Sequence, residues 1–235
     1  MRFTHLTSAE KRKLQSLKRH VHHEYTHELH YKKHISRKAL FYMKEYGPHS
    51  HVFHNIVRES LKVLIFASVL STLGGVGLQS ISQKITAFLP LLILLPALND
   101  MIGDFGTVAS SKISTAIFLG KIKADGCFKS DFVRSLFSVH LKVAVASAVY
   151  ISIASFILAS LQGFVFEPSV FFQVLGITLI ASVFLVTTIF LISFYGGVLI
   201  FKRKEDPNNF LIPMTTAIAD LGSMTIFAIG VSMLL

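Results

Sequence analysis

The sequence is poor in charge and contains a single cysteine. Only 15% of its 235 residues are Asp, Glu, Lys or Arg, whereas about a quarter of the residues in soluble domains are charged. Because Cys127 has no second cysteine to pair with, an internal disulfide framework is excluded. The sequence also lacks a nucleophile paired with a base and a nucleotide-binding loop. We therefore expect neither an enzyme nor an organic cofactor.

Apolar residues take the place of the missing charge. They make up 52% of the chain, and a sequence this apolar is typical of a membrane protein. The remaining charge is concentrated in residues 1–62, which contain 13 of the 23 Lys and Arg residues and 10 of the 11 His residues. This start is too long and too polar for a cleaved signal peptide. We expect residues 1–55 to form a cytosolic segment and residues 56–235 a membrane domain.

Five apolar runs are long enough to cross a bilayer, for which about 20 residues suffice. Basic residues gather between the second and third runs and between the fourth and fifth, and such loops favour the cytosol. We predict an all-α integral protein of the cell (plasma) membrane, multi-pass, with the N-terminus in the cytosol and the C-terminus outside. The predicted spans are residues 63–83, a second beginning near 85, and residues 133–161, 170–201 and 210–235.

The last span contains a carboxylate, in the stretch "TTAIADLGSM" at residues 215–224. Asp220 follows about ten residues after the start of that span, which places it roughly 15 Å deep at 1.5 Å per residue. An aspartate at the centre of a membrane helix costs about 2.5 to 3.5 kcal/mol, and such residues usually face a cavity or an ion pathway. The alternative is a protonated carboxyl that only hydrogen-bonds a neighbouring helix.

Oxygen atoms surround Asp220 on the same helical face. Thr216 precedes it by one turn and Ser223 follows it by one turn. Pro213 lacks the N–H that would bond the carbonyl of Asn209, which leaves a further oxygen near the cytosolic end. Carboxylates, hydroxyls and carbonyls are the ligands of hard cations such as Mg2+.

The second span repeats this pattern. Asp100, Asp104 and Thr107 recur at helical spacing and form one stripe, and small residues beside the stripe allow another backbone to approach. Alone, the stretch could also be a loop at the membrane boundary. Together with Asp220 it favours a shared polar pathway. The predicted pore residues of this span are Asn99, Asp100, Asp104 and Thr107, and Gly103 and Gly106 are predicted backbone ligands or hinges, as are Asn209 and Pro213 of the last span.

Two stretches resemble the signatures of a known family. "PALNDMIGDFGTVASSKISTA", residues 96–116, and "DPNNFLIPMTTAIADLGSMTIF", residues 206–227, are similar to the two signatures of MgtE-type magnesium transporters and of the related solute carrier 41 family. The resemblance covers roughly residues 60–235 and implies a five-helix domain that transports Mg2+. It also implies that Asp220 is the pore carboxylate that holds a hydrated ion and that Thr216 faces the same ion.

The chain departs from this family in two respects. Asp104, after Gly103, stands where the family usually has Asn, and Asp100 adds a second acid nearby, so Mn2+, Co2+ or Ca2+ are alternative cargoes. We also expect no cytosolic sensor domains like those of bacterial MgtE, and one five-helix unit where solute carrier 41 proteins are similar to two such units. Aspartates that lipid cannot cover predict a homodimer with Asp220 near its axis.

The N-terminal segment carries a histidine stripe, at steps of three and four residues along a predicted helix. Imidazoles spaced in this way can chelate a transition metal or respond to pH. They can equally face lipid headgroups or a partner subunit, and the basic residues around them suit anionic membrane lipids. A non-transporting membrane scaffold or a metal or pH sensor is thus the alternative function, and no nucleic-acid partner is expected. The stripe comprises His20, His23, His27, His30 and His34.

Overall fold

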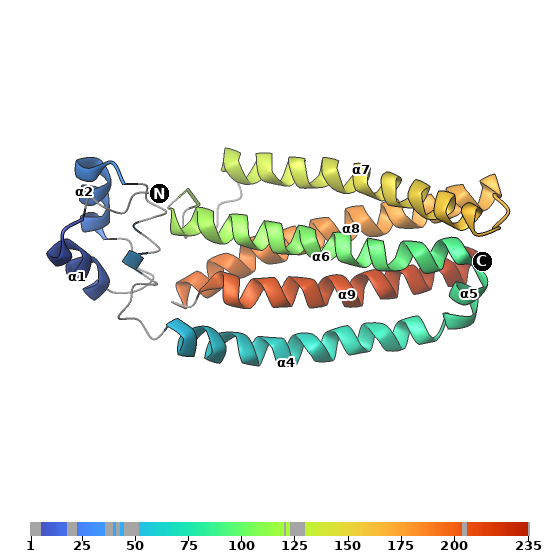
Figure 1. The fold of residues 1–235 in the computed structure, drawn as a ribbon, viewed down its shortest axis with the longest axis horizontal. Coiled ribbons are helices and arrows are strands. Elements are labelled where there is room, and N and C mark those ends of the chain that lie inside the picture. The colour runs from blue at the N-terminus through green and yellow to red at the C-terminus, as the bar shows by residue number, and fades with distance from the viewer. Residues whose placement is uncertain are drawn as a thin grey trace.

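The computed structural model describes residues 6–17, 23–35, 40, 43–44, 52–119, 121–122, 130–203 and 206–234, and the regular secondary structure of these residues is all helical. Two short helices precede a bundle of long ones (Figure 1). In chain order the helices are α1 (Ser8–Ser16), α2 (Glu24–Lys33), α4 (Val52–Gln79), α5 (Ser82–Ala87), α6 (Leu89–Phe118), α7 (Asp131–Leu161), α8 (Pro168–Lys202) and α9 (Pro207–Leu234).

Five helices of the described chain are long and apolar enough to span a membrane, which confirms the predicted all-α membrane fold. They are Ser60–Gln79 within α4, α6, α7, α8 and Pro207–Met233 within α9. The 30 residues of α6 rise roughly 45 Å at 1.5 Å per residue, more than the hydrocarbon core of about 30 Å requires. Which end of the bundle faces the cytosol stays a prediction.

The connection between the first two spans differs from the prediction. The first helix ends at Gln79 instead of 83, because the N–H groups of Ser80 and Ile81 bond the carbonyls of Gly77 and Leu78 in tight turns. The short helix α5 then leads to α6, in whose first turn Pro90 lies. Proline is tolerated there because the first turn of a helix needs no N–H.

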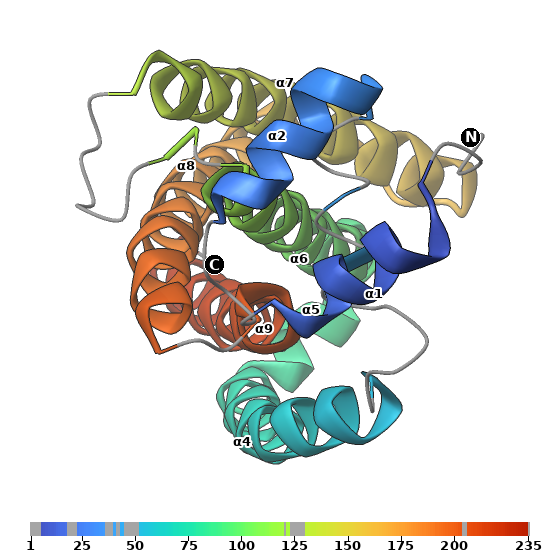
Figure 2. The same ribbon diagram turned by 90° about the vertical axis from the view of Figure 1, so that its left-hand side faces the viewer.

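α6, α8 and α9 pack against one another in the middle of the bundle (Figure 2). α7 lies against α6 and α8, and α4 packs along the outer side of α9. α8 lies behind α6 and α9 in the view of Figure 1, so that one side of the bundle presents α6, α9 and α4 together.

Two glycines allow close helix contacts. A Cβ atom added at Gly74 of α4 would lie 3.0 Å from the Cα of Leu221 in α9, and one added at Gly106 of α6 would lie 3.0 Å from the Oγ1 of Thr215. Both distances are tighter than ordinary van der Waals contact. The separation of α9 from α4 and from α6 is therefore set by residues without side chains.

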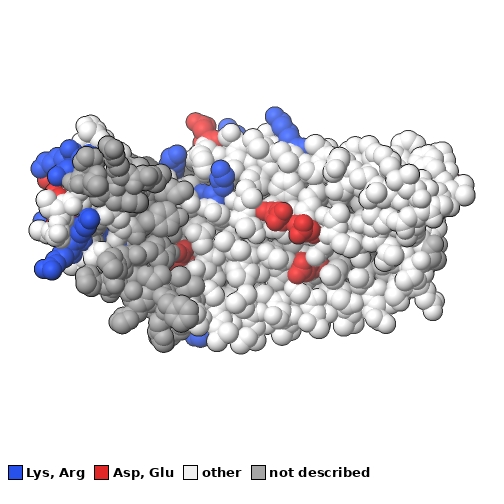
Figure 3. Space-filling model, viewed as in Figure 1, with Lys and Arg blue, Asp and Glu red and all other residues white. Residues whose placement is uncertain are grey.

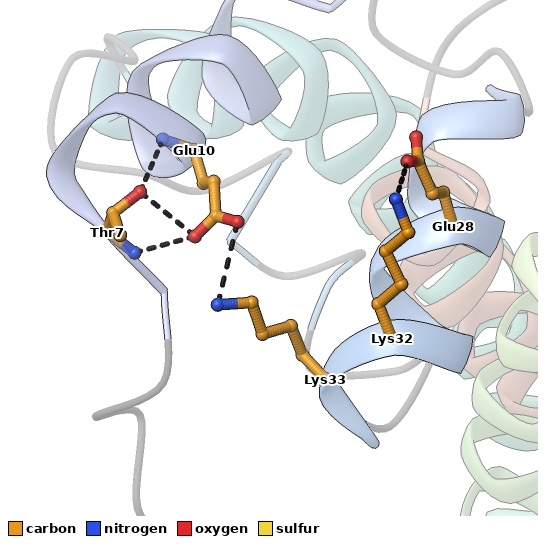
Figure 4. Close-up of polar contacts among 5 residues, drawn as sticks. All are labelled: Thr7, Glu10, Glu28, Lys32 and Lys33. Atoms are coloured by element: carbon orange, nitrogen blue, oxygen red, sulfur yellow. Dashed lines mark hydrogen bonds and ion pairs between the residues drawn. The ribbon is translucent and has the colours of Figure 1, made fainter.

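The helices α1 and α2 form a small unit with its own apolar core of Leu6, Leu14, Leu29 and Leu40, at the end of the bundle where α4 begins. Glu10 joins the two helices (Figure 4). It accepts a hydrogen bond from the backbone N–H of Thr7 at 2.8 Å and lies 3.7 Å from the ammonium of Lys33.

Hydrogen bonds shift two carboxyl groups of this unit. The Thr7 N–H lowers the pKa of Glu10, and the Lys32 ammonium, 2.6 Å from Glu28, lowers the pKa of Glu28. Both groups are therefore ionised at neutral pH. Glu10 joins α1 to α2 through Lys33, whereas Glu28 and Lys32 pair within α2, and such contacts near the surface are weak.

Candidate functional site

Asp220 lies at the middle of α9, where side chains of two other helices hold its carboxylate. Ser71 of α4 donates a hydrogen bond to Oδ2 at 2.7 Å, and the amide nitrogen of Asn99 in α6 donates to Oδ1 at 2.8 Å. The carboxylate is half-buried. Each of its oxygens thus accepts one hydrogen bond and keeps a further lone pair for another donor or for a cation.

Ser223 completes this arrangement. Its hydroxyl donates to the side-chain oxygen of Asn99 and also approaches the backbone carbonyl of Asp220 at 3.2 Å. Because the oxygen of the Asn99 amide is occupied by Ser223, its nitrogen must face Asp220. Ser71, Asn99, Asp220 and Ser223 are called the Asp220 clamp below.

The sequence explains why these side chains meet. Asp220 and Ser223 are one turn apart on α9 and share a face. The small residues of α6 lie against α9 next to the clamp, since a Cβ atom at Gly103 would lie 3.7 Å from the Cγ2 of Thr216. On the other side of α9, Gly74 brings α4 close enough for the short side chain of Ser71 to reach Oδ2.

The two predicted threonines bond within their own helices. Thr216 donates to the carbonyl of Ile212 at 3.0 Å, and Thr107 donates to the carbonyl of Gly103 at 3.2 Å. Their hydroxyl oxygens keep lone pairs that can accept from water. Pro213 lies inside α9, and Asn209 is half-buried near the start of the same helix.

The two other predicted aspartates are not part of the clamp. Asp100 and Asp104 are exposed on α6, near the middle of its length. Figure 3 shows acidic side chains gathered halfway along the apolar bundle, on the side that presents α6, α9 and α4. Within the described residues, no three His, Cys, Asp or Glu side chains lie close enough to hold a metal ion together. Asp100 and Asp104 thus lie on the surface of the bundle, apart from the hydrogen bonds that hold Asp220.

Sequence reasoning missed Ser71. A signal was present, since Ser71 lies one turn before the small cluster of Gly74, Gly75 and Gly77. Hydroxyls in membrane helices usually bond their own backbone, however, as Ser68 and Thr72 of α4 do here. A second unpredicted group lies inside the bundle, where the buried hydroxyl of Ser110 is 3.0 Å from that of Ser193 and 3.4 Å from that of Thr215.

The histidine stripe lies on a shorter helix than predicted. α2 contains His27 and His30, whereas His23 is its N-cap and His34 ends it in a left-handed conformation with φ 51°. The Nδ1 of His30 donates to the carbonyl of Ile35 at 2.6 Å, and His27 stacks on Tyr31. This contact occupies the Nδ1 of His30. His20 lies outside the described residues.

Comparison with known proteins identifies the family of the chain. No curated protein and no solved structure matches the chain. The MgtE family, described as divalent cation transporter, matches residues 95–230, which is more than half of the chain and includes most of α6 and of α9. The resemblance found in the two acidic stretches is confirmed, and the chain belongs to the MgtE family of divalent cation transporters.

Proposed function

We propose that this chain transports Mg2+ across the plasma membrane and that the ion passes Asp220 on a pathway between two copies of the chain. The observation that carries the proposal is the Asp220 clamp, a carboxylate held at the middle of a membrane helix by donors on two other helices. Such an expensive position is usually functional. Since the family transports divalent cations, the carboxylate is best explained as an ion site.

The chemistry of the clamp suits a hydrated ion. Mg2+ demands octahedral oxygen ligands and dehydrates reluctantly, so that proteins usually hold it by one or two carboxylates and several waters. The clamp offers the two half-occupied oxygens of Asp220, with the hydroxyl oxygens of Thr216 and Ser223 nearby on α9. These groups favour contacts to the ion through its waters over a tight cage. Ca2+ takes more oxygen ligands at longer distances and in more flexible geometry, so it depends less on retained waters.

Exposed carboxylates support the dimer. Asp100 and Asp104 lie on the surface of α6 halfway along an apolar helix. Facing lipid, each would cost about 2.5 to 3.5 kcal/mol. A second copy related by a two-fold axis would cover both stripes and enclose water between them, with the two Asp220 clamps facing the same space.

Crosslinking in native membranes tests this dimer. Val108 is 44% exposed and lies one turn after Asp104 on α6, so we expect Val108→Cys, in a Cys127→Ser background, to give a covalent dimer with a short bifunctional reagent. Ile180→Cys is the matched control, because Ile180 is 69% exposed on α8, the helix that lies behind α6 and α9 in the view of Figure 1. A chain that stays monomeric at both positions, or crosslinks equally at both, would contradict the proposed axis.

Flux into liposomes tests the function. Purified protein is reconstituted around a Mg2+-sensitive dye, and uptake is compared with empty liposomes and with liposomes challenged with Mn2+, Co2+ or Ca2+. We expect saturable Mg2+ uptake that exceeds Ca2+ uptake. If no divalent cation moves, the protein is a scaffold or sensor instead of a transporter. If Mn2+ or Co2+ moves better than Mg2+, the additional carboxylates have changed the cargo.

A further inference from the structure

The first spanning helix, α4, reaches the ion site although the family match begins after it, at residue 95. α4 packs mainly along α9, and much of its surface faces away from the bundle. Its contact with the site is the hydroxyl of Ser71, which bonds Oδ2 of Asp220 at 2.7 Å. We propose that Ser71 is a positioning residue for Asp220, and that Gly74 sets the distance at which its hydroxyl acts; this inference rests on the proposed function.

The geometry at the carboxylate explains what Ser71 does. Asn99 donates to Oδ1 from α6 and Ser71 donates to Oδ2 from α4, on opposite sides of α9. A carboxylate with one donor can turn about its terminal torsion, which is broad for Asp. Donors on both oxygens remove this freedom and direct the remaining lone pairs toward the space that an ion and its waters would occupy. A carboxylate that is already positioned loses less conformational entropy when an ion binds.

Ser71 differs from the hydroxyls beside it on the same helix. Ser68 donates to the carbonyl of Leu64 and Thr72 donates to the carbonyl of Ser68, both at 2.8 Å, as hydroxyls of membrane helices commonly do. The hydroxyl of Ser71 instead leaves its helix for a carboxylate. A hydrogen bond to a charged group contributes more free energy than one between neutral groups. This contact therefore stabilises the site by more than ordinary helix packing would.

Gly74 provides a second, independent observation, because it sets the distance between α4 and α9 on which the Ser71 hydrogen bond depends. It lies one turn after Ser71, and a Cβ atom there would meet the backbone of α9 at the Cα of Leu221, 3.0 Å away, and at the carbonyl oxygen of Asp220, 3.2 Å away. Backbone atoms cannot yield as a flexible side chain does. An added methyl group at Gly74 therefore moves α4 away from α9 and lengthens the Ser71 hydrogen bond. Gly75 has no atom within 4 Å of such a methyl group.

The pairs Ser71 and Ser68, and Gly74 and Gly75, supply the variants and their controls. The experiment measures Mg2+ uptake into liposomes as a function of Mg2+ concentration. We expect Ser71→Ala to raise the half-saturating concentration about tenfold, since a hydrogen bond to a charged group is lost, with little change in the maximal rate per folded protein. Gly74→Ala should also raise the half-saturating Mg2+ concentration, although the Ser71 hydroxyl is still present. Ser71→Thr should stay within about twofold of the wild type, because it keeps the donor. Ser68→Ala and Gly75→Ala are the matched controls and should behave as wild type.

Infrared spectroscopy gives a readout that does not depend on transport. The carboxylate band of Asp220 is identified in each background by its loss on Asp220→Asn. We expect this band to shift in Ser71→Ala and in Gly74→Ala and to stay in place in Ser68→Ala and Gly75→Ala. If Ser71→Ala does not fold, Gly74→Ala and Ser71→Thr answer the same question.

The possible failures are distinguishable. A wild-type protein that moves no divalent cation overturns the proposed function, and the infrared band then still decides whether Ser71 holds the carboxylate. If the wild type transports but Ser71→Ala matches Ser68→Ala in both half-saturation and infrared band, the positioning role is wrong. The same holds if Ser71→Thr fails to restore the half-saturating concentration, because α4 would then contribute packing alone.

Discussion

Replacing Asp220 by asparagine is expected to reduce Mg2+ uptake at low ion concentration by at least about 30-fold. At an effective dielectric constant of about 20, a divalent ion about 5 Å from a carboxylate gains roughly 6 to 7 kcal/mol. Losing even a third of this attraction corresponds to a factor of about 30 to 40 in affinity. Asparagine keeps the shape of the side chain, so the change removes charge with little change in packing.

The fold should survive this substitution. The carbonyl oxygen of an asparagine at 220 can still accept from Ser71 or from Asn99, the two donors that hold the carboxylate. Removing a charge from the membrane interior also relieves a cost. We therefore expect Asp220→Asn to be at least as stable as the wild type to heat. The control is Asp131→Asn, which neutralises an exposed carboxylate in the first turn of α7 and should leave uptake unchanged.

The second large effect is expected at Asn99, whose amide links Asp220 to Ser223. Asn99→Ala removes the donor to Oδ1 of Asp220 and the acceptor of the Ser223 hydroxyl together. A hydrogen bond to a charged group contributes about 1.5 to 3 kcal/mol, which predicts a rise of roughly 10- to 100-fold in the half-saturating Mg2+ concentration. The melting temperature should fall as well, because the buried hydroxyl of Ser223 and the half-buried carboxylate of Asp220 each lose a partner.

Two further variants test the role of the Asn99 amide, one at the same position and one as a control. Asn99→Asp places a second acceptor opposite Asp220 at a position where the structure has a donor 2.8 Å away, so it should be worse for the fold than alanine unless a cation or a proton is bound. Gln173→Ala removes an exposed amide from α8 and should change neither uptake nor stability. Uptake by Asn99→Ala equal to that of Gln173→Ala would show that the amide does not act on the ion site.

The membrane fold was predictable because its cause is local. To cross the hydrocarbon, a helix must pair its own backbone N–H and C=O groups and be about 20 apolar residues long. Both properties can be read from each apolar run of the sequence separately. The cost of a charge at the middle of a span is equally local, so Asp220 was identifiable without any knowledge of its neighbours. Ser223 was singled out because it shares a helical face with Asp220, and Asn99 because it lies beside the acidic stripe of the second span; the structure brings both to Asp220.

The role of Ser71 and the length of α2 depended on information that is not local. A serine in a span usually bonds its own helix, and only the approach of α4 to α9 at Gly74 directs Ser71 to a carboxylate. The histidine spacing predicted one long helix, but α2 contains only ten residues and ends at His34. A regular spacing indicates which residues could share a face, and it does not determine where a helix stops.

The pore roles of Asp100 and Asp104 stay predictions for a related reason. Their spacing placed them on one face of α6, and both are exposed there. Whether that face meets a second copy depends on the surface of the whole bundle, which a helical pattern does not describe. The crosslinking of Val108→Cys addresses this question directly.

The central claim is that the Asp220 clamp is the site of the transported ion. An experimental structure of the protein in Mn2+, with anomalous scattering recorded for wild type and for Asp220→Asn, tests it most directly. We predict an anomalous peak close to Asp220 in the wild type, between two copies of the chain, that disappears in Asp220→Asn. A wild-type structure whose ion peak lies away from α6 and α9, or a peak beside residue 220 that persists after the substitution, would contradict the account.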